Sequence, residues 1–290
     1  MHIVEWLRPG DLKTGWDLYE MLEPIGIAAR PEVPVTFRRV STRAQLVAVV
    51  RTLRDEFATN GRIPLLHIET HGNDEGIGVS KEEHILWRDL MDELIPLNRQ
   101  TGLRLTVVLA ACEGIWGIQM LQPGRRAAAY LGLIGPKRTI ESQALATAIQ
   151  SFCRTAFERL DGNAAFKAMN DGIDPSEATF LSVSAQTTFA MVWRGYFQEL
   201  CTEAGIERRL DSMEANAIAQ RRAARLPDMS TRDKNRARAL AREFLTNHRA
   251  RFDELRRDFF FIAQFPENDV RFDVKFEDCQ QTVAKPNAPV

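Results

Sequence analysis

The chain has 290 residues, 44% of them hydrophobic, and a formal net charge of −1 at pH 7. This length and apolar content are enough for one large domain, or for a domain with an extension, and they exclude a disordered protein. The near-zero charge gives the molecule as a whole no preference for nucleic acid or acidic membranes. No apolar run has the length of a signal peptide or a membrane span, and the four cysteines lack Cys-x-x-Cys spacing. We expect a protein of the reducing cytoplasm without a membrane segment.

The first half of the chain alternates short apolar runs with longer amphipathic stretches, which is typical of parallel strands joined by helices. The predicted strands are 2–7, 33–40, 63–70, 103–111, 127–134 and 179–184. The predicted helices are 11–23, a segment capped by Ser41 or Thr42, 87–95, 140–157 and 163–171. Pro96 is expected to end the third helix, and residues 76–87 to form a small hairpin with its turn at 81–83. The pattern predicts an α/β domain with a mainly parallel sheet.

The sequence changes character near residue 187, after which helical periodicity dominates to about residue 260. Between 221 and 257 there are twelve Arg or Lys and five Asp or Glu, so twelve minus five leaves a local charge of +7. One side of the predicted helix in this stretch is apolar and must bury against the domain or a partner. That side consists of Leu240, Phe244, Leu245, Phe252, Leu255 and Phe259. The cluster Phe259-Phe260-Phe261 with Phe265 is expected to anchor the extension to the domain.

Two residues with catalytic chemistry follow predicted core strands. His71 comes after the strand 63–70 and Cys112 after the strand 103–111. In an open parallel sheet, chemistry gathers outside the carboxyl ends of the strands, so neighbouring strands would bring the two side chains together. A cysteine nucleophile needs an imidazole nearby, because the thiolate is the attacking form. The N–H groups of Gly72 and Cys112 are candidate donors to a developing oxyanion.

Other patterns in the sequence have simpler interpretations. A single cysteine after an apolar strand is most often a small buried hydrophobe, and a single histidine is usually structural, so the proposed chemistry depends on both occurring together. His67 and His71 lack the glutamate that a helical zinc-protease motif requires directly after its first histidine, so we expect no metal. We interpret His67 as a satisfied core residue or as a residue that supports the site from behind. The glycines at 72–78 and 132–135 lack nucleotide-loop spacing and are interpreted as turns.

The segments around His71 and Cys112 resemble a known family. LLHIETHGNDEGIGVS and TVVLAACEGIWG resemble the histidine and cysteine motifs of caspase-like (clan CD) cysteine peptidases, closest to the bacterial branch with CHAT domains. The hairpin GIGVSKEEHILWRDL and the later segment AAAYLGLIGPKRTIESQALATAIQSFCRTAF extend the resemblance over roughly residues 1–190. The chain departs from the caspase pattern at Ala110, where caspases have glutamine, and its histidine and cysteine are separated by 41 residues rather than about 50.

The resemblance implies a three-layer caspase-like sandwich with a mainly parallel central sheet and a C-terminal helical extension. The implied domain covers 1–186, the extension covers 187–278, and residues 279–290 form a disordered tail. His71 would then be the general base and acid, Cys112 the nucleophile, and Gly72 with Cys112 the oxyanion hole. Asp74 and Glu113 are weak candidates for the substrate pocket, although a solvated loop charge is the simpler interpretation of each. The Arg125-Arg126 pair can be an autocleavage site or an ordinary exposed pair.

The leading hypothesis is a cofactor-free cysteine endopeptidase acting on a protein substrate, in a bacterial defence (antiviral) or regulated cell-death pathway. The alternative is a catalytically silent caspase-fold module that binds a regulatory protein through its helical extension. A weaker third hypothesis is nucleic-acid binding by residues 221–257, which the apolar side of the helix and the interspersed acids disfavour.

Overall fold

The structure is a computed structural model that describes residues 1–121, 127–171 and 179–280. By its internal contacts the chain divides into two compact units, Met1–Thr188 and Phe189–Val290. The boundary expected from the sequence follows residue 186. In the described residues, no helix combines the length and apolar character needed to cross a lipid bilayer.

A six-stranded sheet forms the centre of the first unit, with the strand order β2-β1-β3-β7-β8-β9. The strands are β1 (His2–Glu5), β2 (Thr36–Arg39), β3 (Leu65–Glu69), β7 (Thr106–Ala110), β8 (Gly132–Pro136) and β9 (Phe180–Ser184). All neighbours pair in parallel except β8 and β9, which are antiparallel. A separate antiparallel sheet consists of β4 (His71–Gly72), β5 (Gly76–Gly78) and β6 (His84–Leu86). The predicted α/β class with a mainly parallel sheet is confirmed.

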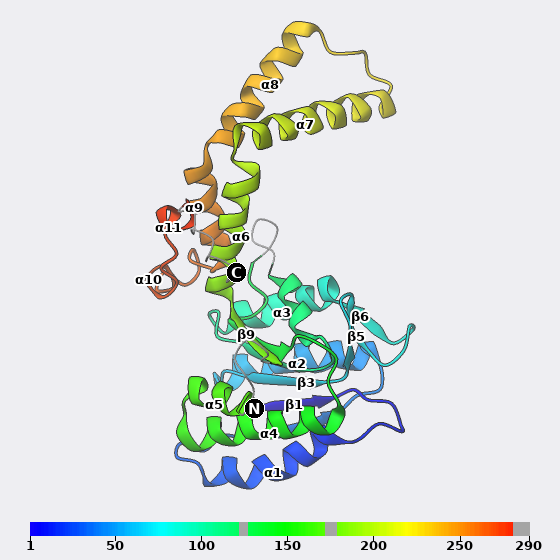
Figure 1. The fold of residues 1–290 in the computed structure, drawn as a ribbon, viewed down its shortest axis with the longest axis vertical. Helices are drawn as coiled ribbons and strands as arrows, with labels where there is room; N and C mark the ends of the chain where they lie inside the picture. Colours follow the sequence, from blue (N-terminus) through cyan, green and yellow to red (C-terminus); the bar gives the residue numbers. More distant parts are fainter. Residues whose placement is uncertain (122–126, 172–178, 281–290) are drawn as a thin grey trace, which may run out of the picture. The chain divides into compact units, whose positions relative to one another are not determined.

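Helices cover both faces of this sheet (Figure 1). The helices of the first unit are α1 (Thr14–Ala28), α2 (Arg43–Asn60), α3 (Trp87–Gln100), α4 (Ser142–Arg159) and α5 (Gly162–Met169), with a 3₁₀ helix η1 (Gly114–Met120). Helices α1, α4 and α5 bury their apolar sides on one face in a shared core, and α2 and α3 lie on the other face (Figure 1). The first unit is therefore a three-layer α/β sandwich.

Local sequence features explain why α2 starts and ends where it does. The Thr42 side chain accepts a hydrogen bond from the Gln45 N–H at the start of the helix, as expected of an N-cap. Gly61 ends it in the left-handed conformation, at φ 66°. Helix α3 corrects the sequence-based expectation, because it runs through Pro96 to Gln100. Proline removes one helical hydrogen bond, and the burial of apolar side chains on both sides of Pro96 outweighs that loss.

Two further expectations about the first unit were wrong. The strand expected at 127–134 is β8, which begins only at Gly132, so residues 132–135 form a strand rather than a turn. A Cβ atom on Gly135 would lie 2.9 Å from the Gly114 carbonyl carbon. The glycine thus lets the segment after β7 pack directly on β8. Gly76 and Gly78 likewise lie in β5 rather than in a turn.

The second unit is helical and has an aromatic core. Its helices are α6 (Ala185–Leu200, which begins in the first unit), α7 (Glu203–Ala223), α8 (Thr231–Thr246), α9 (His248–Phe259), α10 (Asn268–Arg271) and α11 (Phe276–Gln280). Phe189 packs against the rings of Phe252, Phe259 and Phe260, at centroid distances of 5.1–5.5 Å.

The C-terminal part differs from the expectation in two ways. The apolar side predicted for one helix is split between α8 and α9 at Asn247, whose backbone is not helical (φ −79°, ψ 60°). Phe259 and Phe260 are buried among aromatic rings of the second unit, and their expected role of anchoring the extension to the domain stays a prediction. Cys279 and Gln280, expected in the disordered tail, belong to α11, and residues 281–290 lie outside the described residues.

Candidate active site

Neighbouring strands place His71 and Cys112 at the same edge of the sheet. Strand β3 pairs with β7 in parallel, with Glu69 opposite Ala110. His71 comes two residues after Glu69, and Cys112 comes two residues after Ala110. Because adjacent strands lie about 4.8 Å apart, we expect the two residues to lie side by side. A Cβ atom on Gly72 would lie 2.8 Å from the Cys112 carbonyl oxygen, which shows how closely the two segments approach.

A third residue, which the sequence reasoning missed, contacts the histidine. The Nε2 atom of His71 lies 2.7 Å from Oδ2 of Asp11, in the loop between β1 and α1. The same oxygen accepts a hydrogen bond from the Arg8 N–H, also at 2.7 Å. Burial by itself raises the pKa of the Asp11 carboxyl, but the hydrogen bonds from His71 and Arg8 outweigh it, and the pKa lies below its ordinary value. An ionised carboxylate only accepts, so Nε2 carries the proton and Nδ1 is the basic nitrogen.

Two buried carboxylates hold the start of α1 and, with it, the loop that carries Asp11. Glu5 of β1 and Glu69 of β3 are register partners, and both are buried. The Trp16 N–H in the first turn of α1 donates to Glu5 Oε2 at 3.2 Å. A Cβ atom on Gly15 would lie 2.9 Å from Glu69 Oε2, so the start of the helix lies close to this carboxylate. Burial raises the pKa of Glu69, and the positive end of the helix dipole favours both carboxylates.

Cys112 lies in a tight turn directly after β7. Its Sγ atom is half-buried and lies 3.8 Å from the carbonyl oxygen of Ile140. Glu113 adopts the left-handed conformation, at φ 56°, and Gly114 packs against Gly135 of β8. The turn places Cys112 at the carboxyl end of β7, at the same edge of the sheet where β3 leads into His71.

The other three cysteines have less favourable surroundings for nucleophilic chemistry. Cys153 is fully buried, and burial raises its pKa to about 12. Burial also raises the pKa of Cys279. Cys201 is half-buried, with Sγ 3.4 Å from Nδ1 of His248, and burial again raises its pKa. A raised pKa lowers the thiolate fraction near neutral pH, so these cysteines are poor nucleophiles.

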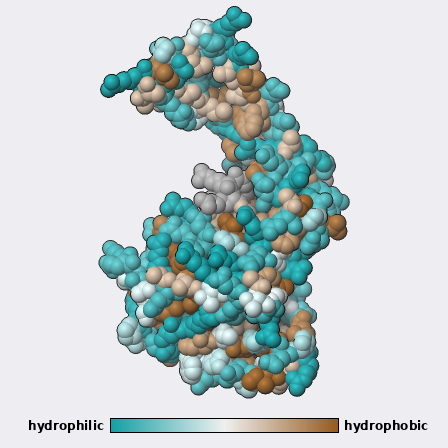
Figure 2. Space-filling model, turned by 180° about the vertical axis from the view of Figure 1, so that it is seen from behind, coloured by the Kyte–Doolittle hydropathy of each residue, from teal (hydrophilic) through white to brown (hydrophobic). Residues whose placement is uncertain are grey.

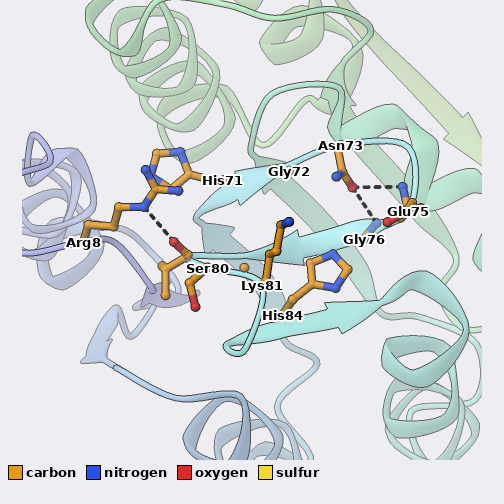
Figure 3. A pocket seen from close by; sticks show the side chains of 11 residues that line it. Arg8, His71, Gly72, Asn73, Glu75, Gly76, Ser80, Lys81 and His84 are labelled. Carbon is orange, nitrogen blue, oxygen red and sulfur yellow. Dashed lines mark hydrogen bonds between the residues drawn. The ribbon is translucent and has the colours of Figure 1, made fainter.

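A cavity of about 460 Å³ opens beside His71 (Figure 3). One wall is Arg8, whose Nε donates to the Val79 carbonyl at 2.7 Å, and the other walls come from His71, Gly72 and the β5–β6 hairpin. Cys112 is not one of the described residues that line it. The cavity therefore lies on the histidine's side of the pair.

The candidate pocket residues lie elsewhere among the described residues. Neither Asp74 nor Glu113 lines the cavity beside His71. Asp74 contributes its backbone carbonyl, which accepts hydrogen bonds from the ring nitrogen of Trp87 at 3.1 Å and the side-chain amide of Gln119 at 2.8 Å. The Arg125-Arg126 pair lies outside the described residues.

His67 is a core residue, as expected, but its ring nitrogens are not satisfied. Its side chain is completely buried on β3, and its Nε2 lies 3.6 Å from Glu69 Oε2, too far for a good hydrogen bond. Neither ring nitrogen has a hydrogen-bond partner in the described residues. Within 1–121, 127–171 and 179–280, no group of three or more His, Cys, Asp or Glu side chains could hold a metal ion.

Two comparisons with known proteins found nothing similar to this chain. No protein-family model matches the chain, and a search of curated proteins found no similar sequence.

Proposed function

We propose that the protein is a caspase-like cysteine endopeptidase of the CHAT type that cleaves a protein substrate. The observation that carries the proposal is the hydrogen bond between Asp11 and His71 at the strand end adjacent to Cys112. A carboxylate that fixes one imidazole nitrogen leaves the other free to serve the nucleophile, which is the arrangement that nucleophilic catalysis requires. The β5–β6 hairpin also follows His71 where the resembled motifs imply a strand pair.

In the proposed reaction, Sγ of Cys112 attacks the scissile carbonyl carbon while Nδ1 of His71 takes the thiol proton. The N–H groups of Gly72 and Cys112 stabilise the oxyanion. The C–N bond then breaks, and His71 gives its proton to the leaving amine. Water, deprotonated by His71, attacks the thioester, releases the carboxylic acid and restores the thiol. Asp11 is a positioning residue that acts through His71, and no cofactor is needed.

The first test is the alkylation of the full chain by iodoacetamide near neutral pH, with peptide mapping of the labelled cysteine. We expect Cys112 to react at least tenfold faster than the other three cysteines, and His71→Ala to remove this difference. Cys201→Ala is the matched control, because it removes another half-buried thiol near a histidine. If Cys112 reacts no faster than Cys201, or if His71→Ala leaves its rate unchanged, the peptidase proposal is wrong.

A second candidate function, partner binding through the extension, is favoured by the hairpin formed by α7 and α8. None of the residues 211–240 is buried. The core shared by the two helices consists of Ile206, Leu210 and Leu245 with Ala241. Two helices with so little buried surface gain little stability from packing, since helical stability in proteins comes mostly from the apolar face.

The hairpin surface combines apolar and basic character. Leu240 and Phe244 are 58% and 57% exposed, and Figure 2 shows apolar residues among hydrophilic ones on the hairpin at the top of the view. A cavity of about 160 Å³ between the helices has a mostly apolar lining that includes Met213 and Ile218. Residues 221–236 contain six Arg or Lys and two Asp. An acidic protein with an apolar helical face would complement this surface.

Hydrogen exchange of the isolated chain tests this second candidate. We expect the amides of 211–240 to exchange much faster than those of α4, because a hairpin that awaits a partner opens locally at low cost. Protection of 211–240 equal to that of α4 would mean that the hairpin is stable by itself, and would count against a binding role.

A further inference from the structure

The cavity beside His71 is positioned for one particular part of a substrate. In the proposed reaction the acyl group stays on Cys112, and the leaving amine takes its proton from His71. A cavity lined by His71 and Gly72, with Cys112 absent from its described lining, therefore lies next to the leaving-group side of the scissile bond.

Cationic side chains outnumber acidic ones in the described lining of the cavity. Arg8 and Lys81 are the cations among the described lining residues, and Glu75 is the one acid. The hydrogen bond from Arg8 Nε to the Val79 carbonyl fixes the guanidinium at the side of the cavity next to His71. Figure 3 shows Glu75 at the far end from Arg8, with Lys81 between them. The part of the cavity nearest the reacting bond therefore holds the Arg8 guanidinium, and the Asp11 carboxylate bonded to His71 offsets part of its charge.

His84 supplies a second, independent observation. Its Nε2 atom is buried and has no hydrogen-bond partner among the described residues, although the residue lines the cavity. The ring lies against Gly76, where a Cβ atom would come within 2.9 Å of Nε2. A buried polar atom without a partner is costly, so a rotation of the His84 ring that brings Nε2 to a ligand in the cavity gains free energy.

We propose that this cavity binds an anionic side chain within the first few residues after the scissile bond, held by Arg8, Lys81 and His84. The carboxylate of Asp or Glu and the phosphate of phosphoserine share this chemistry. The inference rests on the proposed peptidase function, because that function defines the leaving-group side.

The test is cleavage of a proteome-derived peptide library by the full chain, with the new N-termini identified by mass spectrometry. We expect Asp and Glu to be enriched at least fivefold in the first three positions after the cleaved bond. Lys81→Glu should abolish this enrichment and favour Lys or Arg instead. Arg88→Gln is the matched control, because it removes an exposed cation of α3 outside the cavity. Treating the library with phosphatase distinguishes phosphoserine from Asp and Glu.

A binding measurement makes the test independent of turnover. The imidazole NMR signals of Cys112→Ala, which contains five histidines, are followed during titration with a hexapeptide carrying two Asp and with its Asn counterpart. We expect the Asp peptide alone to shift the His84 signal. If His84 responds to neither peptide, or if cleavage shows no acidic enrichment, the cavity inference is overturned while the peptidase function stands. If the alkylation test fails, both are overturned.

Discussion

The contact between Asp11 and His71 gives the sharpest prediction. Asp11→Asn keeps the shape of the side chain but removes its charge, and an amide can donate to Nε2 and so favour the wrong tautomer of His71. Hydrogen bonds to charged groups contribute about 1.5–3 kcal/mol. The Asp11 and His71 side chains are 27% and 41% exposed, so solvent weakens the interaction. We therefore expect about 1–2 kcal/mol, around and below the lower end of this range. This corresponds to a loss of about 5- to 30-fold in rate.

The measurements are the alkylation rate of Cys112 and the kcat and KM for the best peptide found in the library. Because Asp11 acts through His71, kcat should fall while KM stays within about twofold, a pattern that general destabilisation would not produce. Asp17→Asn, an equal loss of charge on α1, should leave both constants unchanged. The reasoning is refuted if Asp11→Asn retains full kcat, or if its entire effect is on KM.

Three further predictions concern stability and geometry. Burial lowers the pKa of His2 from 6.5 to about 4, so the unfolded chain binds more protons in this window, and stability should fall by about 1–2 kcal/mol on acidification from pH 6.5 to pH 4. Urea titrations at several pH values should show a smaller fall in the free energy of unfolding for His2→Gln than for the wild type. Gly72→Ala would place a Cβ atom 2.8 Å from the Cys112 carbonyl oxygen, so we expect slower alkylation and a loss of about 1–3 kcal/mol, measured by the same titration. Phe252→Ala should destabilise the second unit by about 3–5 kcal/mol, seen by circular dichroism, and a loss below 1 kcal/mol would contradict the packing described.

The sequence was sufficient to predict the class of the first unit and the edge where its candidate site lies. Apolar runs that each end in a polar residue predict β3 and β7, and both strands end near the expected residues. The predicted boundaries of β8 were less accurate. Its glycines resemble turn residues, and the sequence does not show which segment packs against them. The predicted end of α3 at Pro96 was wrong for a similar reason. The rule that proline ends a helix is local and does not include the burial of the apolar side chains of α3.

Asp11 could not be identified from the sequence, because it precedes His71 by 60 residues in a turn that looks ordinary. The segment Arg8-Pro9-Gly10-Asp11 is typical of an exposed turn. Asp11 can reach His71 only because β1 lies next to β3 in the sheet. The order of the strands along the chain does not reveal that these two strands are neighbours. One pattern could have identified Asp11. It is an acidic residue in the turn after a strand that pairs with the strand leading to the predicted catalytic histidine.

The closeness of Cys201 and His248 has a consequence for the modularity of the chain. These residues flank the α7–α8 hairpin, and their side chains meet at 3.4 Å, so the hairpin leaves and re-enters the second unit at almost the same point. A segment whose two ends adjoin can be removed or exchanged with little strain, because a short linker closes the gap at small entropic cost. We therefore expect that residues 203–246 can be replaced by another segment while the aromatic core of the second unit stays in place.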